Sequence, residues 1–353
     1  MEKKIMSRTI LREKDTRILN IAVEQYLRIG QPVSSGTIAR QTSFSVSSAT
    51  VRNVMVKLES QGYLHQLHTS SGRIPTDKGL RFYVNALQEE AHAVPDNINL
   101  PPQDILPGGC DLNTMLVQAS RLLSEYSDNL GFVISPKISR INLNSIRFIK
   151  IAENRIFIIL ITLKNLVLTG AVDTSEYFSQ NTLDEAARFI NRNFSGKNLI
   201  FIRNYLLEQM PKYRVQFSDA FHKVALMLRR YISQEEKESQ IFVEGTSKLL
   251  GKPELVKEGG LIKLFEKLEQ KEKLAKLLAD FISLQHVKVL IGSELDLPDV
   301  LGCALVLSHY GHNRQVLGSL GILGPKRIPY RKIIPVVDCV AKKLSRSLSL
   351  YES

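Results

Sequence analysis

The chain has 353 residues, 44% of them hydrophobic and 23% charged, which is typical of a soluble globular protein with two or three domains. Its net charge of +12 favours an anionic partner, either nucleic acid or a membrane surface. No apolar run approaches the roughly eighteen residues of a membrane span, and the amino-terminal sequence lacks a hydrophobic signal region. Three cysteines without CxxC spacing indicate reduced thiols, so we expect a cytoplasmic protein with no membrane partner.

The amino-terminal part is predicted to contain three helices. Apolar residues at three- and four-residue spacing predict a helix over residues 15–29, which Gly30 ends. A short second helix follows over residues 35–41. Ser47 is a suitable N-cap for a third helix, because its hydroxyl can accept a hydrogen bond from a free N–H group of the first turn, and Gly62 ends that helix. The last two helices have helix-turn-helix spacing.

The third helix has two different faces. One face is an apolar stripe made of Val51, Val54, Met55 and Leu58. The other is small or hydrogen-bonding and consists of Ser48, Ala49, Arg52 and Asn53. Arg can pair with guanine O6 and N7 and Asn with adenine N6 and N7, so this face suits a helix that enters a major groove. The alternative is an ordinary helix and hairpin on the surface of a larger domain.

A basic β-ribbon is predicted after the third helix. Residues 63–68 read as a strand, residues 69–72 as a turn and residues 73–74 as the return strand, which Pro75 shortens. Thr76 can cap a further helix over 77–90. We therefore predict a winged helix-turn-helix over residues 1–90. The expected DNA contacts are Ser35, Thr37, Ser47, Ser48, Ala49, Thr50, Arg52, Asn53, Lys57, His68, Thr69, Ser70 and Arg73.

The rest of the chain is predicted to be α+β. Residues 91–112, rich in proline and glycine, form a linker before a helix over 113–129 and a strand over 132–136. Strands over 145–151, 155–163 and 166–172 form an antiparallel meander. Helices follow over 183–194, 197–210, 218–238 and 261–284, with a short strand over 240–243. Strands over 287–291, 303–310 and 315–321 and a helix over 335–347 close the chain. This order predicts one α/β domain, 113–172 plus 285–353, interrupted by a mainly helical insertion over 173–284.

No catalytic constellation, cofactor site or metal site is expected. His309 and His312 have the spacing of metal ligands but no third ligand within reach in the sequence. The glycine-rich run 318–324 opens no helix, so we interpret it as tight turns between strands and not as a phosphate-binding loop.

Four stretches resemble one known family, the heat-inducible transcription repressors of bacteria called HrcA. They are QPVSSGTIA (31–39), SSATVRNVMVKLESQGYLHQLHTSSGRIPTDKGLRFYV (47–84), IFVEGTSKLL (241–250) and LGSLGILGPKRIPYRKIIPVVD (317–338). Val54 stands where members of the family usually have an acidic residue, and Ser71 stands where their turn has alanine.

The resemblance implies a winged helix, a GAF-like α/β domain and an inserted dimerising domain. It implies a homodimer that represses chaperone operons at an inverted-repeat operator of double-stranded DNA. It also implies that the chaperonin GroEL keeps the protein competent and that heat releases it from DNA.

Two other functions remain open at this point. The first is a winged-helix regulator gated by a small molecule in the GAF-like domain, which a thermal-shift screen would detect because an effector stabilises the state it binds. The second is an enzyme built on the α/β domain, which the missing acid/base or nucleophile set disfavours.

Overall fold

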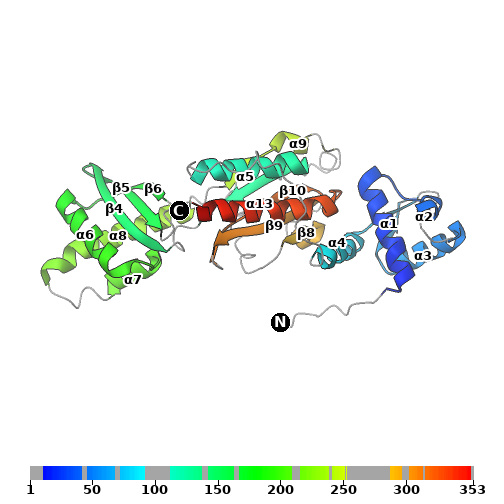
Figure 1. Cartoon of the computed structure of the whole chain (residues 1–353), viewed down its shortest axis with the longest axis horizontal. Helices are drawn as coiled ribbons and strands as arrows, with labels where there is room; N and C mark the ends of the chain where they lie inside the picture. The colour runs from blue at the N-terminus through cyan, green and yellow to red at the C-terminus, as the bar shows by residue number, and fades with distance from the viewer. Residues whose placement is uncertain are drawn as a thin grey trace. The chain divides into compact units, whose positions relative to one another are not determined.

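The computed structural model describes residues 11–41, 46–67, 72–91, 112–136, 142–162, 167–208, 215–237, 241–250, 252, 287–295, 302–312 and 315–350. The predicted α+β class is confirmed: the described strands form a two-stranded, a three-stranded and a five-stranded sheet, each accompanied by helices (Figure 1). The described residues belong to two compact units. The first takes its residues from 1–97, 289–305 and 324–335, and the second from 98–288, 306–323 and 336–353.

The first unit begins with three helices and a β-ribbon. The helices are α1 (Glu13–Ile29), α2 (Ser35–Gln41) and α3 (Ser48–Ser60), and α4 (Asp77–Ala91) follows the ribbon. Strands β1 (Leu64–Gln66) and β2 (Arg73–Pro75) pair antiparallel, and Val33 makes an isolated bridge to Arg73. The apolar stripes of the helices form one core, in which each of the following side chains is at most 2% exposed: Ile18, Leu19, Val23, Ile38, Val51, Met55 and Leu58.

The predicted helix ends are confirmed at four positions. The Ser47 hydroxyl accepts a hydrogen bond from the Thr50 N–H at 3.2 Å, and the Thr76 hydroxyl accepts one from the Gly79 N–H at 3.2 Å. Gly30 and Gly62 follow their helices with φ of 76° and 77°, a left-handed conformation that favours glycine. Local sequence therefore determines these four helix ends.

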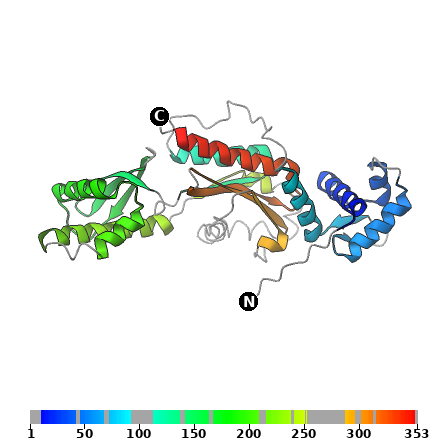
Figure 2. The same cartoon turned by 60° about the horizontal axis from the view of Figure 1, so that its bottom comes forward.

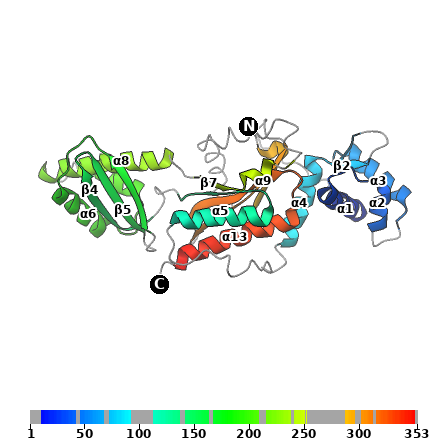
Figure 3. The same ribbon diagram turned by 90° about the horizontal axis from the view of Figure 1, so that it is seen from above.

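The five-stranded sheet has the order β7–β3–β10–β9–β8. Its strands are β3 (Leu130–Ile134), β7 (Ile241–Glu244), β8 (Lys288–Ile291), β9 (Cys303–His312) and β10 (Gln315–Pro325). Helices α5 (Leu112–Ser127) and α13 (Tyr330–Leu350) lie on the same face of it (Figures 2 and 3). A Cβ atom at Gly131 of β3 would lie 2.2 Å from the Ser120 carbonyl oxygen of α5, so only glycine permits this close packing.

The glycine-rich run 318–324 is not a set of turns, and that interpretation is wrong. It lies inside β10, in extended conformation. A Cβ atom at Gly318 would meet the Tyr310 hydroxyl at 2.4 Å, and one at Gly321 would meet the Val306 carbonyl oxygen at 2.2 Å. The glycines thus leave room for neighbouring atoms of the sheet.

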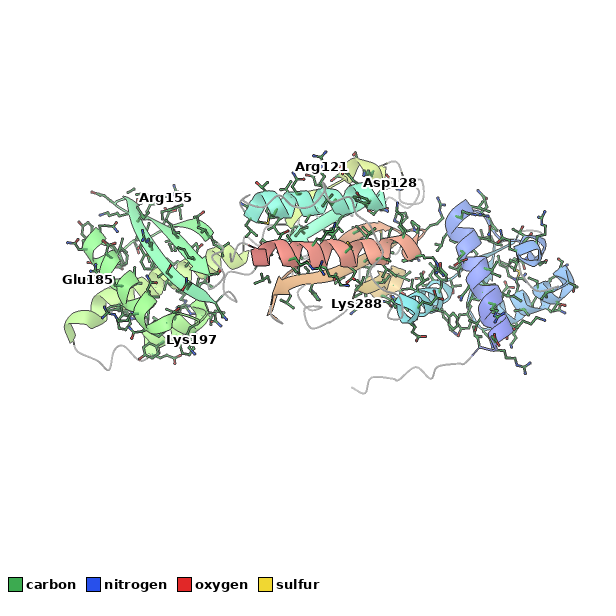
Figure 4. All side chains as sticks on the ribbon, viewed as in Figure 1. Arg121, Asp128, Arg155, Glu185, Lys197 and Lys288 are labelled. Atoms are coloured by element: carbon green, nitrogen blue, oxygen red, sulfur yellow. The ribbon has the colours of Figure 1, made fainter. Side chains whose placement is uncertain are left out.

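The three-stranded sheet is separate from the five-stranded one. Its strands β4 (Leu143–Ala152), β5 (Arg155–Thr162) and β6 (Val167–Asp173) form an antiparallel meander, as predicted. Helices α6 (Gln180–Phe194) and α8 (Val215–Lys237) lie against one face, and α7 (Leu199–Glu208) packs on α8 (Figures 2 and 3). Arg155, labelled in Figure 4, begins β5 and forms an ion pair of 3.7 Å with Asp173 on β6.

Two expectations about these sheets are wrong. The meander was expected in one sheet with the strands near residues 287 and 303, but it pairs only with itself among the described strands. Strand β7 was expected within the helical insertion, but it pairs with β3, with Ile241 opposite Ile134. Strand composition reveals that a segment is buried but not which strand lies beside it, and this caused both errors. The predicted helix over 261–284 and nearly all of the linker over 91–112 lie outside the described residues.

Candidate nucleic-acid interface

Helix α3 is fixed to α1 by a buried carboxylate. The Lys57 ammonium donates to the Asp15 carboxylate at 2.6 Å, and the Asp15 side chain is only 6% exposed. An unpaired carboxylate at this depth would be costly, so Lys57 balances its charge. Lys57 was predicted to contact DNA, and in the structure its ammonium group pairs with Asp15.

The β-ribbon is fixed to α3 in a similar way. Glu59 on α3 accepts hydrogen bonds from the Arg73 guanidinium at 2.8 Å and from the Gln66 N–H at 3.1 Å. The Arg73 side chain is 11% exposed. Arg73 was predicted to contact DNA, but its guanidinium is engaged with Glu59 and leaves little surface for an external ligand.

The opposite face of α3 is open. Ser48, Ala49, Arg52 and Asn53 are all exposed, as the helical period predicts. A purely structural role for Arg52 would require an ion pair, and Glu59 and Glu24 are the candidate carboxylates. Those carboxylates instead bind other groups: Glu59 binds Arg73, and Glu24 binds the Tyr83 hydroxyl at 3.1 Å and Arg331 at 3.3 Å. Within the part of the chain that the structure describes, the Arg52 guanidinium has no acidic partner.

A set of hydroxyl groups joins the beginnings of α2 and α3. The Ser34 and Thr37 hydroxyls are 2.9 Å apart, and the Ser47 and Thr50 hydroxyls are also 2.9 Å apart. The Ser35 and Ser48 hydroxyls, one from each helix, are 3.1 Å apart. Five of the predicted contact residues are thus brought together beside the open face of α3: Ser35, Thr37, Ser47, Ser48 and Thr50. The predicted contacts His68, Thr69 and Ser70 lie outside the described residues.

Sequence reasoning missed one residue of this face. Val56 is 49% exposed, although it is a large apolar side chain. It follows Arg52 by four residues and Asn53 by three, so it lies on the same face of the helix. The helical period alone could have found it, because Val56 does not fit the buried stripe.

Ion pairs also connect the helices of the first unit to its carboxyl-terminal residues. Asp77 pairs with Lys326 at 2.6 Å, and Arg331 pairs with Glu90 at 3.2 Å as well as with Glu24. Arg81 pairs with Glu294 and donates to the Val289 carbonyl at 2.7 Å. Residues over 200 positions apart in sequence therefore hold α1 and α4 in this unit.

Burial raises the pKa of the Tyr83 phenol to about 12, and the neighbouring Glu24 carboxylate adds to the shift. Tyr83 is consequently neutral at physiological pH and donates its hydroxyl proton to Glu24. This hydrogen bond places Glu24 beside Arg331 and away from the open face of α3.

Of the two histidines with the spacing of metal ligands, only His309 has a described side chain. The His309 ring shares a hydrogen bond of 2.9 Å with the Ser319 hydroxyl on the neighbouring strand. No group of three potential metal ligands occurs among the residues with described positions. None of the described helices is long and apolar enough to cross a membrane.

The structure is that of an α+β protein in which helix α3 exposes Arg52 and Asn53, two side chains of the kind that hydrogen-bond to base edges. The family model described as "HrcA protein C terminal domain" matches residues 113–334. Relatives named heat-inducible transcription repressor HrcA match nearly the whole chain. The relative from Geobacter sulfurreducens is 33% identical over 96% of this chain and 99% of its own. The one from Syntrophobacter fumaroxidans is 32% identical over 96% and 97%. The chain therefore belongs to the HrcA family.

One solved structure supports the fold. It is titled a hypothetical protein, has a TM-score of 0.63 and 22% identity, and covers 97% of this chain and 100% of its own.

Proposed function

We propose that the protein represses transcription of chaperone operons by binding an inverted-repeat operator as a homodimer. In this proposal α1–α3 and the β1–β2 ribbon are a winged helix-turn-helix, and α3 enters the major groove. Family membership and the names of the relatives support the repressor role.

The observation that carries the proposal is the open face of α3. The charged groups behind it are paired inward, since Lys57 binds Asp15 and Arg73 binds Glu59. Arg52 and Asn53 on the front remain exposed. A helix held firmly from behind, with an Arg and an Asn free in front, suits direct reading of base edges.

A second exposed surface supports the homodimer. On one face of the three-stranded sheet, Ile149, Ile151 and Val167 are 42%, 54% and 53% exposed. Phe157 lies opposite Ile149 and Ile161 opposite Val167, so apolar residues occur on this face in all three strands, and Arg147 and Thr169 lie among them, opposite Ile159. We call this the open sheet face. Large apolar patches on soluble proteins usually mark interaction sites, and a second copy of the chain offers the same surface.

We further propose that the inserted dimerising domain spans about residues 142–237, which differs from the expected 173–284. Strands β4–β6 and helices α6–α8 pack on one another, so this segment has a core of its own. In the same proposal the five-stranded sheet with α5 and α13 is the GAF-like domain, built from residues on both sides of the insertion.

For regulation we propose dependence on the GroEL chaperonin and release from DNA on heat stress, as the family resemblance implies. The open sheet face gives a physical motive, because an unpaired monomer would expose apolar side chains that a chaperonin binds. The test is to refold the diluted protein with and without chaperonin and ATP, then titrate operator DNA. Equal operator-competent fractions in the two samples would rule out this dependence.

The repressor role is tested by footprinting on the chain's own promoter and on the promoter of the chaperonin operon. The proposal expects protection of an inverted repeat in two half-sites on one side of the duplex. The Asn53→Ala variant should lose this protection at concentrations where the matched surface variant Asn85→Ala keeps it. Absence of protection by the unmodified chain on both promoters would refute the role.

A further inference from the structure

Val56 sits at the centre of the open face of α3. It lies one turn after Arg52 and Asn53 and two turns after Ala49. At 100° per residue, Ala49 and Val56 fall between Arg52 on one side and Asn53 on the other. The middle of the proposed reading surface is therefore apolar, with hydrogen-bonding groups on both sides.

The polar neighbours of Val56 on the following turn do not cover the exposed half of this side chain. Lys57 turns towards Asp15, and Glu59 turns towards Arg73. The Ser60 hydroxyl donates to the Lys57 carbonyl at 2.8 Å. Each described polar neighbour on the following turn is thus directed towards the protein, and Val56 remains 49% exposed.

A single chemical group in the major groove suits an apolar side chain at this place. Among the four bases only thymine carries a methyl group there, and apolar contact with that methyl distinguishes it from cytosine and the purines. Valine is β-branched and holds one side-chain rotamer in a helix, so little conformational entropy is lost when it makes such a contact.

We propose that Val56 is a specificity-determining residue that reads the 5-methyl group of one thymine in each operator half-site. The proposal rests on the function proposed above and adds an apolar contact to the hydrogen bonds of Arg52 and Asn53. It predicts that one thymine per half-site is required for its methyl group and not for its pairing.

The test uses the full chain and the inverted repeat found by footprinting. Each thymine of one half-site, and its symmetry mate in the other, is replaced in turn by deoxyuridine, which lacks only the methyl group. The unmodified chain should lose affinity at one position, by roughly fourfold per half-site and roughly fifteenfold when both are changed. Val56→Ala should bind the normal operator with that same loss and lose nothing more at the deoxyuridine.

A matched variant separates this reading role from a general effect of removing an exposed valine. Val117 on α5 is 36% exposed, and Val117→Ala should keep the affinity and deoxyuridine profile of the unmodified chain. Because Val56 is exposed, the melting temperature of Val56→Ala should match that of the unmodified chain.

Two outcomes would overturn the inference while leaving the repressor role intact. In one, the unmodified chain binds every deoxyuridine operator as tightly as the normal operator. In the other, Val56→Ala retains the same loss at the sensitive position, so that another residue reads the methyl. A failure of the unmodified chain to bind any inverted repeat would instead refute the proposed function itself.

Discussion

Strands β9 and β5 each contain a run of apolar residues, but the two runs have different surroundings. Residues 303–307 of β9 are all apolar, and each is at most 3% exposed, so both faces of this strand are covered. Residues 156–161 of β5 are equally apolar, but only Ile156, Ile158 and Leu160 are buried, while Phe157, Ile159 and Ile161 keep partial exposure. A fully apolar strand can therefore have one face covered by its own core and the other face left partly exposed.

The proposed partner of the open sheet face is a second copy of the chain, and a charge placed there should have the largest effect. Ile149→Asp puts a carboxylate into the proposed interface, where it would be desolvated without a cation. We expect the dimer to dissociate at micromolar concentration, measured by light scattering coupled to size-exclusion chromatography.

The control for this experiment is Val117→Asp, which introduces the same charge at a comparably exposed apolar residue on α5. This variant should remain a dimer. A dimeric Ile149→Asp protein would show that the open sheet face is not the subunit interface.

Substitutions on the buried faces of the five-stranded sheet should lower the stability of the fold and leave the oligomeric state unchanged. Leu320 on β10 is fully buried, and Leu320→Ala should reduce the free energy of unfolding by about 2–5 kcal/mol. Ile151→Ala, placed in the monomeric Ile149→Asp protein, should cost less than about 1 kcal/mol because Ile151 is 54% exposed. Denaturant titration measures both, and equal losses would mean that the two sheets are buried alike.

Arg52 on α3 is also exposed, so its replacement should affect binding and not stability. Arg52→Ala should weaken operator binding by about 1–3 kcal/mol and relax preference at one base pair, with thermal stability unchanged. Binding to a series of single-base operator variants measures this. A loss of stability with unchanged base preference would indicate that Arg52 serves the fold.

Arg73 should behave in the opposite way to Arg52. Because its guanidinium pairs with Glu59, Arg73→Ala should lower the free energy of unfolding by roughly 1–2 kcal/mol. The salt dependence of operator affinity should remain unchanged. If Arg73 contacts a phosphate, the slope of log affinity against log salt would instead fall by about one.

Much of the first unit could be predicted from sequence because its signals are local. Ser47, Thr76 and the two left-handed glycines act on neighbouring residues. The helix period correctly predicts that Val51, Met55 and Leu58 are buried, whereas Val54 of the predicted stripe is only half-buried. The ion pairs could not be predicted. Lys57 finds Asp15 at a distance of 42 residues, and pairing of this kind depends on how the helices pack.

The division of the strands between two sheets could not be predicted from the sequence either. Strands β5 and β9 carry the same kind of apolar run, so composition could not assign them to different sheets. The open sheet face is a property of the packed helices α6 and α8, which cover one side and leave the other.

The two exposed surfaces are proposed to act together: α3 reads DNA, and the open sheet face pairs two copies so that two half-sites are read together. The most direct test compares affinity for a full inverted repeat with affinity for one half-site, using the unmodified chain and Ile149→Asp. We predict that the unmodified chain prefers the full site by roughly a hundredfold or more, since both reading helices contribute. We predict that Ile149→Asp binds both duplexes with similar, weak affinity. If Ile149→Asp still prefers the full site, or if the unmodified chain does not, two copies do not pair through the open sheet face to read both half-sites.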